Sequence, residues 1–398
     1  MLSRVNQSVH LQIKVELPAE GVNGVIPHLV AQRSAILQQV VAQVIEHLQE
    51  QWIEAVERAE AELICHGCGV VHAGRTGWVR RGRRTRVLQT LAGGLVLPLV
   101  QTTCGLCGKT RAPYAEALGL GTPERYSAEL RRTLIERVYE MSYRKSAHLA
   151  QELWGVRLSA STLHRFVQRT AERVQLTPCA GAVPLLADGT KVRAGERAEQ
   201  EDLRLAFQLL GRSVQGGRSR AELRLVGLAA GLGSWPAVLR RDCAAPVVIT
   251  DAEASLPAHV RACYPEARHQ WCEWHVGYTL DWSLLEDRVP KKERKRLQSE
   301  LTGILWGKQG QRTKQRRYAR FLKQLPPRSR KQLERARPHI LFDAPSRERT
   351  TSLVERQMRE INRRVNVGVR WSLRGVENLM RLAMTQRHNA DDYHRLWS

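Results

Sequence analysis

The hydrophobic pattern changes its period several times along the chain. Apolar and polar residues alternate over 9–17, which predicts a half-exposed strand. From 26 to 64 the apolar positions recur at helical spacing, which predicts a long amphipathic helix or a helical hairpin. Such an element would either form a dimerisation arm or pack on its own domain, and the pattern favours neither.

Residues 126–176 carry the pattern of three helices. Ser127 is a good cap for the first helix, Gly155 makes a turn, and Ser159 or Ser161 would cap the third helix. A short helix, a glycine turn and a polar-faced helix are typical of a helix-turn-helix, although a plain helical hairpin has the same pattern. The candidate groove-facing residues are Ser161, Thr162, Arg165 and Gln168.

Short apolar runs then alternate with helix-length segments, which predicts a mixed sheet flanked by helices. One run, 183–187, ends in Asp188, and another, 247–250, ends in Asp251. The run over 267–275 reads as one more strand. An acid at the carboxyl end of such a strand sits at the sheet edge where α/β proteins place their chemistry.

The last third of the chain is predicted to be helical. Residues 276–345 are basic and polar with interleaved apolar positions, which indicates a helical insertion into the sheet domain, or else a solvated charged face. The helix after Thr350 carries Glu355, Arg359 and Asn362 on one face. Glu355 would alternatively close a capping box with Ser352.

Composition adds a strong positive charge. The chain has 398 residues, with 63 Lys and Arg against 39 Asp and Glu, a net charge of +24. A polyanion partner is therefore expected, and nucleic acid is the default, against the alternative of a basic protein that merely stays soluble. We find no apolar run near ~18 residues and no signal-peptide pattern, so we expect an intracellular protein without a membrane partner.

Four of the eight cysteines form two C-x-x-C pairs, at Cys65 and Cys68 and at Cys104 and Cys107. Two such knuckles predict a four-cysteine zinc ribbon holding one structural Zn²⁺, with a redox pair as the alternative. Apolar runs over 87–91 and 95–100 predict a hairpin joined at 93–94. Between the knuckles lies a basic stretch suited to phosphates or to a solvated face, with candidate DNA contacts Arg80, Arg81, Arg83 and Arg84.

Asp188, Asp251 and Glu355 would form a three-carboxylate cluster. Oxygen-only ligands suit Mg²⁺ or Mn²⁺, and two such ions support phosphodiester cleavage and transfer. The candidate phosphate-holding residues on the helix of Glu355 include Arg356, Arg359 and Arg363.

In these three acids and in Cys272-Glu-Trp-His275, the chain resembles prokaryotic insertion-sequence DDE transposases of the Mutator-like group. The resemblance implies a ribonuclease H-like catalytic domain with a helical insertion between the second and third acids. It also implies that Cys272 and His275 support the site. Two alternatives for them are a zinc set with Cys263 and His269, and a buried cysteine with a satisfied histidine.

The expected fold class is thus α/β and multi-domain. We predict a strand and helical arm over 1–64, the zinc ribbon over 65–120, the helix-turn-helix over 121–177 and the ribonuclease H-like domain over 178–398, with its insertion at about 276–345.

The expected function is that of a DNA transposase. It would bind the terminal inverted repeats of an insertion sequence and catalyse metal-dependent strand cleavage and transfer. Its partners would be double-stranded DNA, as element ends and target, and further copies of the chain in a homodimer or higher oligomer. It would be cytoplasmic and associated with the nucleoid. The alternatives are a ribonuclease H-like endonuclease without strand transfer and a domesticated DNA-binding regulator.

Overall fold

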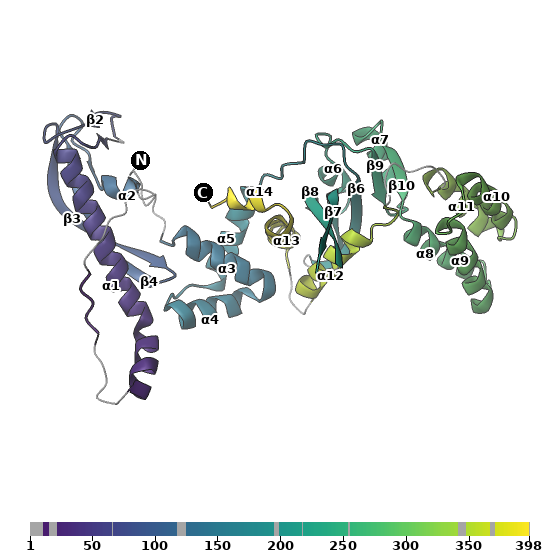
Figure 1. Cartoon of the computed structure of the whole chain (residues 1–398), viewed down its shortest axis with the longest axis horizontal. Coiled ribbons are helices and arrows are strands. Elements are labelled where there is room, and N and C mark those ends of the chain that lie inside the picture. The colour runs from purple at the N-terminus through teal and green to yellow at the C-terminus, as the bar shows by residue number, and fades with distance from the viewer. Residues whose placement is uncertain are drawn as a thin grey trace. The chain divides into compact units, whose positions relative to one another are not determined.

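A computed structural model describes residues 11–15, 22–65, 67–117, 125–194, 199–216, 218–253, 255–340, 348–366 and 371–397. Its last two residues apart, the chain divides into two compact units, 1–166 and 167–396. Helices and sheets are mixed, as the α/β expectation requires (Figure 1). Among the described helices, none is both long and apolar enough to cross a membrane.

The first unit is built on one long helix against a hairpin. Helix α1 (Val22–Glu57) packs on strand β4 (Gly93–Cys104), which pairs with β3 (Trp78–Thr90). Ile53 and Val56 of α1 are buried against the hairpin residues Trp78 and Val100. The long amphipathic helix is confirmed, and in this chain it packs on its own domain.

The strand predicted over 9–17 is wrong for 11–15, and its other residues lie outside the described part. Gln43 of α1 accepts from the Gln12 amide at 3.1 Å and donates to its carbonyl at 2.6 Å. Gln39 bonds both backbone groups of Lys14 in the same way. These backbone groups are therefore satisfied by glutamine side chains of α1 instead of a neighbouring strand.

The predicted hairpin exists but turns at Leu91 and Ala92, two residues before 93–94. Gly93 has φ +97°, and a Cβ there would lie 3.0 Å from the Trp154 carbonyl oxygen, so glycine is required at this position. The remaining short elements at this end of the unit are β1 (Leu63–Ile64), β2 (Val71–His72), β5 (Thr110–Arg111) and α2 (Pro113–Ala117).

Three helices follow, as predicted: α3 (Ala128–Glu140), α4 (Tyr143–Trp154) and α5 (Ala160–Glu172). The Ser127 hydroxyl accepts from the Leu130 amide at 3.2 Å, and the Ser159 hydroxyl accepts from the Thr162 amide at 3.1 Å. Gly155 ends α4 with φ 65°. The caps expected at Ser127 and Ser159 are confirmed, while a helix-turn-helix function stays a prediction.

The second unit contains a five-stranded mixed sheet of order β10-β9-β6-β7-β8. Strands β6, β7 and β8 form an antiparallel meander, and β9 and β10 add to β6 in parallel. The strands are β6 (Leu185–Ala194), β7 (Glu199–Gln215), β8 (Arg218–Ala230), β9 (Val247–Thr250) and β10 (Arg268–Trp271).

Helices cover both faces of this sheet (Figure 1). One core contains Leu185 and Ala187 of β6 together with residues of α6 (Trp235–Val238) and α7 (Leu256–Cys263). The alternate β6 residues therefore point to the other face, where α12 (Ser352–Val365) packs. Helix α13 (Leu373–His388) packs against β8.

The predicted insertion is helical and has its own core. It begins slightly earlier than expected, since β10 stops at Trp271 and Cys272 is already the N-cap of α8. A strand running to His275 is therefore wrong. The helices are α8 (Glu273–Glu286), α9 (Lys291–Leu305), α10 (Gln311–Leu322) and α11 (Pro327–Ile340), and residues 341–347 lie outside the described part.

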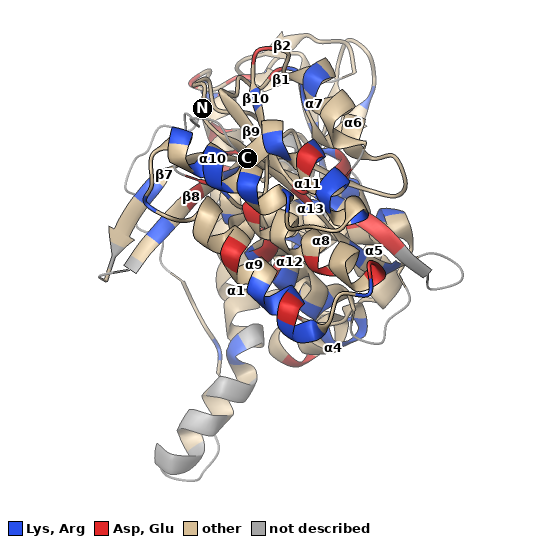
Figure 2. Cartoon of the chain, turned by 90° about the vertical axis from the view of Figure 1, so that its right-hand side faces the viewer, with Lys and Arg blue, Asp and Glu red and all other residues tan. Residues whose placement is uncertain are grey.

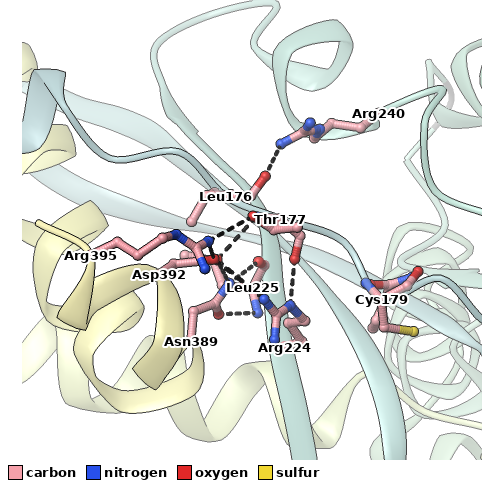
Figure 3. Close-up of polar contacts among 10 residues, drawn as sticks. Leu176, Thr177, Cys179, Arg224, Leu225, Arg240, Asn389, Asp392 and Arg395 are labelled. Carbon is pink, nitrogen blue, oxygen red and sulfur yellow. Dashed lines mark hydrogen bonds and ion pairs between the residues drawn. The ribbon is translucent and has the colours of Figure 1, made fainter.

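Asp392 of helix α14 (Ala390–His394) links the segment around Thr177 and the C-terminal helix to strand β8 (Figure 3). Its buried carboxylate accepts from the Thr177 amide at 3.0 Å and from Asn389 at 2.8 Å, and it pairs with Arg224 at 3.4 Å. Burial alone would raise the pKa of Asp392, but these donors lower it below its usual value. The C-terminal helix is thereby held on β8, next to the segment that enters the sheet.

Candidate active site and metal centre

The two aspartates lie on neighbouring parallel strands. Asp251 directly follows β9, as predicted, whereas Asp188 lies inside β6 because β6 pairs with β7 over its full length. The expectation that Asp188 ends its strand is wrong. Leu185 is level with Val248, and continuing this register places Asp188 level with Asp251. Parallel neighbours are only about 4.8 Å apart, so the two acids share one edge of the site.

Helix α12 brings Glu355 to the same face of the sheet. Asn362, one of the residues expected on the Glu355 face, donates to the Thr190 hydroxyl of β6 at 3.0 Å. The predicted apolar stripe is buried and consists of Val354, Met358 and Ile361. The face of α12 that carries Glu355 is thus held against the strand that carries Asp188.

The capping-box alternative for Glu355 is wrong. The N-cap of α12 is Thr351, which makes no side-chain cap bond, and Ser352 is already helical. The Oε1 atom of Glu355 is buried and has no hydrogen-bond partner. Glu355 is therefore not needed to close the helix start, and a buried carboxylate oxygen without a donor calls for a ligand.

Cys272 and His275 meet Glu355. Within the described residues, ligand atoms of these three side chains all lie within 4.8 Å of one another. Cys272 is fully buried, and its Sγ accepts from the Thr351 amide at 3.4 Å. The C-x-x-H segment at the start of α8 therefore fixes the first residues of α12, which position Glu355.

The alternative zinc set with Cys263 and His269 is not assembled in the described part of the chain. Cys263 donates to the Leu239 carbonyl oxygen at 3.3 Å, beside the α6–α7 core. His269 instead bonds the Thr250 hydroxyl at 2.9 Å. The uneven spacing in sequence thus corresponds to separate locations in the fold.

The site is electrostatically unbalanced. Burial raises the pKa of Asp188 to about 6 and also raises the pKa of Asp251. The charge of His275 lowers both pKa values, but only by part of that rise. Burial would lower the pKa of His275, but Cys272 and the two aspartates raise it to about 9. Two neighbouring carboxylates with raised pKa values favour a cation between them.

The chain offers suitable metal ligands here. The Asp188 Oδ2 atom, like Glu355 Oε1, is buried without a hydrogen-bond partner, and carboxylate oxygens are the ligands that Mg²⁺ and Mn²⁺ prefer. The three carboxylates are not among the described groups whose ligand atoms all lie within 4.8 Å. The side chains therefore fit such a metal chemically but are spread wider than the group around Glu355.

One nearby pair was not predicted from the sequence. Glu273, between Cys272 and His275, is buried and pairs with Arg349 at 3.4 Å. Arg349 also donates to the Leu305 carbonyl oxygen of α9 at 3.0 Å. The guanidinium of Arg349 is thus engaged by groups of the protein itself. The signal in the sequence was the acid within the C-x-x-H segment, which needs a cation once it is buried.

Basic side chains remain exposed on α12 and on the insertion. Arg356, Arg359 and Arg363 are exposed, and Arg363 pairs with Glu360 at 3.3 Å. Figure 2 shows Lys and Arg along α10 and α11 as well. The described residues therefore present positive charge beside Glu355 and across the insertion, as a polyanion partner requires.

The four ribbon cysteines come together in the first unit, all within 4.8 Å. Cys65 and Cys107 have their sulfurs 3.6 Å apart, and Cys68 and Cys104 have theirs 3.8 Å apart. A tetrahedral zinc with bonds of about 2.3 Å requires sulfur separations of about 3.8 Å, so the cluster fits Zn²⁺. The His72 ring nitrogen lies 3.3 Å from Cys104 Sγ and suits an outer-sphere partner.

The predicted DNA-contacting arginines of β3 divide into two pairs. Arg80 binds Glu50 of α1 at 2.7 Å, and Arg83 binds Glu46 at 2.5 Å and Glu50 at 2.8 Å. Arg81 lies at the bulge where the hairpin register shifts, and Arg81 and Arg84 are both exposed. Only this second pair is directed away from α1.

We therefore expect the double variant Arg81→Ala, Arg84→Ala to bind duplex DNA more weakly. The slope of log affinity against log salt should fall by about 2, because each lost phosphate contact removes about 0.9 from it. Arg80→Ala with Arg83→Ala is the matched control and should leave the slope nearly unchanged. Titrations over a range of salt concentrations measure both. Equal slope changes would show that the ion pairs with α1 open on binding.

The candidate groove-facing residues of the predicted helix-turn-helix lie on α5, and their contact with DNA stays a prediction. Ser161 is exposed, and its hydroxyl lies 2.7 Å from that of Ser159. Arg165 is exposed and donates to the Thr162 hydroxyl at 3.3 Å. Gln168 accepts from Asn378 at 2.5 Å, so its side-chain oxygen is engaged within the second unit.

Residues 242–394 match the family model described as Transposase, Mutator family. In this segment, the chain resembles transposases of the Mutator family. The matched segment contains Asp251, Cys272, His275 and Glu355, whereas Asp188 lies before it. No curated protein matches the chain. That family implies a DNA partner and a nuclease or strand-transfer enzyme in general terms.

Proposed function

We propose that this transposase cleaves DNA at the ends of its element and joins the resulting 3′-hydroxyls to target DNA, using Asp188, Asp251 and Glu355. The observation that carries the proposal is the level position of buried Asp188 on β6 and half-buried Asp251 after β9, with α12 holding Glu355 over the same face. A meander of three antiparallel strands extended by two parallel strands supports a ribonuclease H-like fold.

In this mechanism, Asp188, Asp251 and Glu355 are the residues that would hold two Mg²⁺ or Mn²⁺ ions. The ions, when bound, would activate the attacking water or 3′-hydroxyl and stabilise the leaving oxygen. Burial of Asp188 keeps water from its oxygens and leaves Oδ2 unpaired for the ions, while Oδ1 accepts from the Gly189 amide at 2.8 Å. Cys272 positions the start of α12, and the exposed arginines of α12 hold phosphates on either side of the scissile bond.

The first unit supplies recognition in this proposal. The zinc ribbon presents Arg81 and Arg84, and the third helix of the helix-turn-helix presents Ser161, Thr162 and Arg165, to the terminal inverted repeats. Two element ends must be brought together before joining. We therefore infer that the working species is a homodimer or a higher oligomer.

The test is a joining reaction with the full chain and Mg²⁺. Inverted repeats in the DNA flanking the reading frame define the end duplex, which is supplied already cleaved with a labelled strand ending in a 3′-hydroxyl. We expect label to appear in a supercoiled target plasmid. Cleavage of an intact end without joining would favour a plain endonuclease, and binding without either reaction would favour a regulator.

A further inference from the structure

We propose that an aromatic ladder on α8, formed by Trp274, Tyr278 and Trp282, binds unpaired nucleotides next to the cleavage site by base stacking. This inference rests on the proposed function, because it concerns the DNA that occupies the same site. It adds a second type of substrate contact, to bases freed from the duplex, beside the phosphate contacts of the arginines.

The three aromatic side chains are exposed to solvent instead of packing in the core. Their residues are 53%, 49% and 53% exposed, in the order Trp274, Tyr278 and Trp282. The rings of Trp274 and Tyr278 are stacked, with centroids 5.4 Å apart and planes 7° apart. The Trp282 ring lies edge-on to Tyr278, with centroids 6.3 Å apart and planes at 74°. The core of the insertion uses the opposite side of α8, through Val276 and Leu280. The ladder is therefore not required for packing the insertion.

The ladder begins at the candidate active site. The Trp274 ring lies edge-on to the His275 ring, with centroids 5.0 Å apart, and His275 belongs to the group around Glu355. From Trp274 to Trp282 the helix rises about 12 Å, at about 1.5 Å per residue. Stacked bases on one strand repeat every 3.4 Å or so, so the ladder spans about three nucleotides.

Charge favours a nucleic acid over a protein as the occupant. At its far end, Trp282 lines a hollow of about 410 Å³ together with Arg328, Lys331 and Arg335. Arg328 pairs with Glu286 at 3.1 Å, which leaves the hollow with a net positive lining. Flat rings beside cationic side chains are the recurring design for single strands, whose bases stack while their phosphates are neutralised.

A second hollow adjoins the first one on the side of α8 that carries Val276. It has a volume of about 390 Å³, begins at Ala252 next to Asp251, and shares Thr279, Gln332 and Arg335 with the first hollow. The two hollows therefore lie next to each other between α8 and α11. Paired bases are inaccessible to the rings, so the ladder selects strands that have opened beside the cut.

The test compares two end duplexes that are identical except for a three-nucleotide single-stranded overhang carrying 2-aminopurine. With the wild-type transposase, we expect quenching of the 2-aminopurine and tighter binding of the overhang than of the blunt duplex. Tyr278→Ala or Trp282→Ala should remove about tenfold or more of that preference, as the loss of one stacked base does. Binding of the blunt duplex should stay unchanged.

Trp306→Ala is the matched control, since Trp306 is another exposed tryptophan of the insertion, at 55%. It should keep the overhang preference, and Trp282→Phe should largely keep it too. Equal binding of both duplexes by the wild type, or a loss that is the same in Trp306→Ala, would overturn the ladder. So would a change only in self-association or protein binding. If joining fails but the preference depends on the ladder, the proposed function is wrong and the ladder stands.

Discussion

Asp251→Asn is expected to abolish end cleavage and joining while leaving DNA binding intact. Asparagine keeps the shape of the side chain but removes the charge that the proposed ions would require. Loss of an outer-sphere partner of a metal ligand already costs about 10- to 100-fold, so loss of a direct ligand should exceed about 100-fold. The joining assay with a pre-cleaved end measures the defect, and filter or gel binding of the same end measures the affinity.

The same variant should not be less stable than the wild type. Burial raises the pKa of Asp251, so its charged form is less favourable in the folded protein than in the unfolded chain. Removing that charge takes away a cost that is present above the folded pKa, so the melting temperature at neutral pH should stay equal or rise. Such a gain in stability on loss of activity is typical of a functional site.

Asp391→Asn is the control, since Asp391 is exposed on α14. It should join ends at the wild-type rate. Full joining by Asp251→Asn would refute the assignment of the acids. Lost joining together with a large fall in the melting temperature would instead indicate that Asp251 has a structural role.

The sequence predicted the parts of the site that depend on local pattern. A β-branched run followed by an acid located Asp251 at the end of β9, and helical periodicity placed Asn362 on a face that contacts β6. Both statements need only the period of a strand or a helix. For the same reason the helical insertion and the three helices with their serine caps were predictable.

The rest depends on long-range pairing. Asp188 looked like the end of a strand because its apolar run stops there, yet pairing with β7 extends β6 to Ala194. The contact of Cys272 with Thr351 joins residues 79 apart in sequence. Arginine counts were misleading for a similar reason, because acids on α1 neutralise Arg80 and Arg83. No local pattern reveals which charges are paired across a fold.

Removing zinc is expected to unfold the ribbon end of the first unit and to abolish tight binding of the element ends. The local elements are too small to hold themselves, since β1, β2 and β5 each have two residues. The Gly67 amide helps to lower the pKa of Cys65 to about 6, while the neighbouring sulfurs help to raise that of Cys68 to about 12. The Cys68 thiol therefore ionises at neutral pH only when a cation binds the cluster.

Structural zinc contributes an apparent 10–16 kcal/mol or so at neutral pH, about as much as the whole stability of an ordinary domain. Cys65→Ser should thus lose the metal and lower end affinity by more than about tenfold, whereas Cys179→Ser, in the second unit, should retain both. Zinc content by metal analysis and end binding by titration check the two effects.

Thermal unfolding should show an early transition in Cys65→Ser while the transition of the second unit stays in place, because β6 to β10 share no ligand with the ribbon. Retention of one zinc per chain with normal end affinity would contradict the assignment. A single transition shifted downward as a whole would mean that the ribbon supports the catalytic fold as well as recognition.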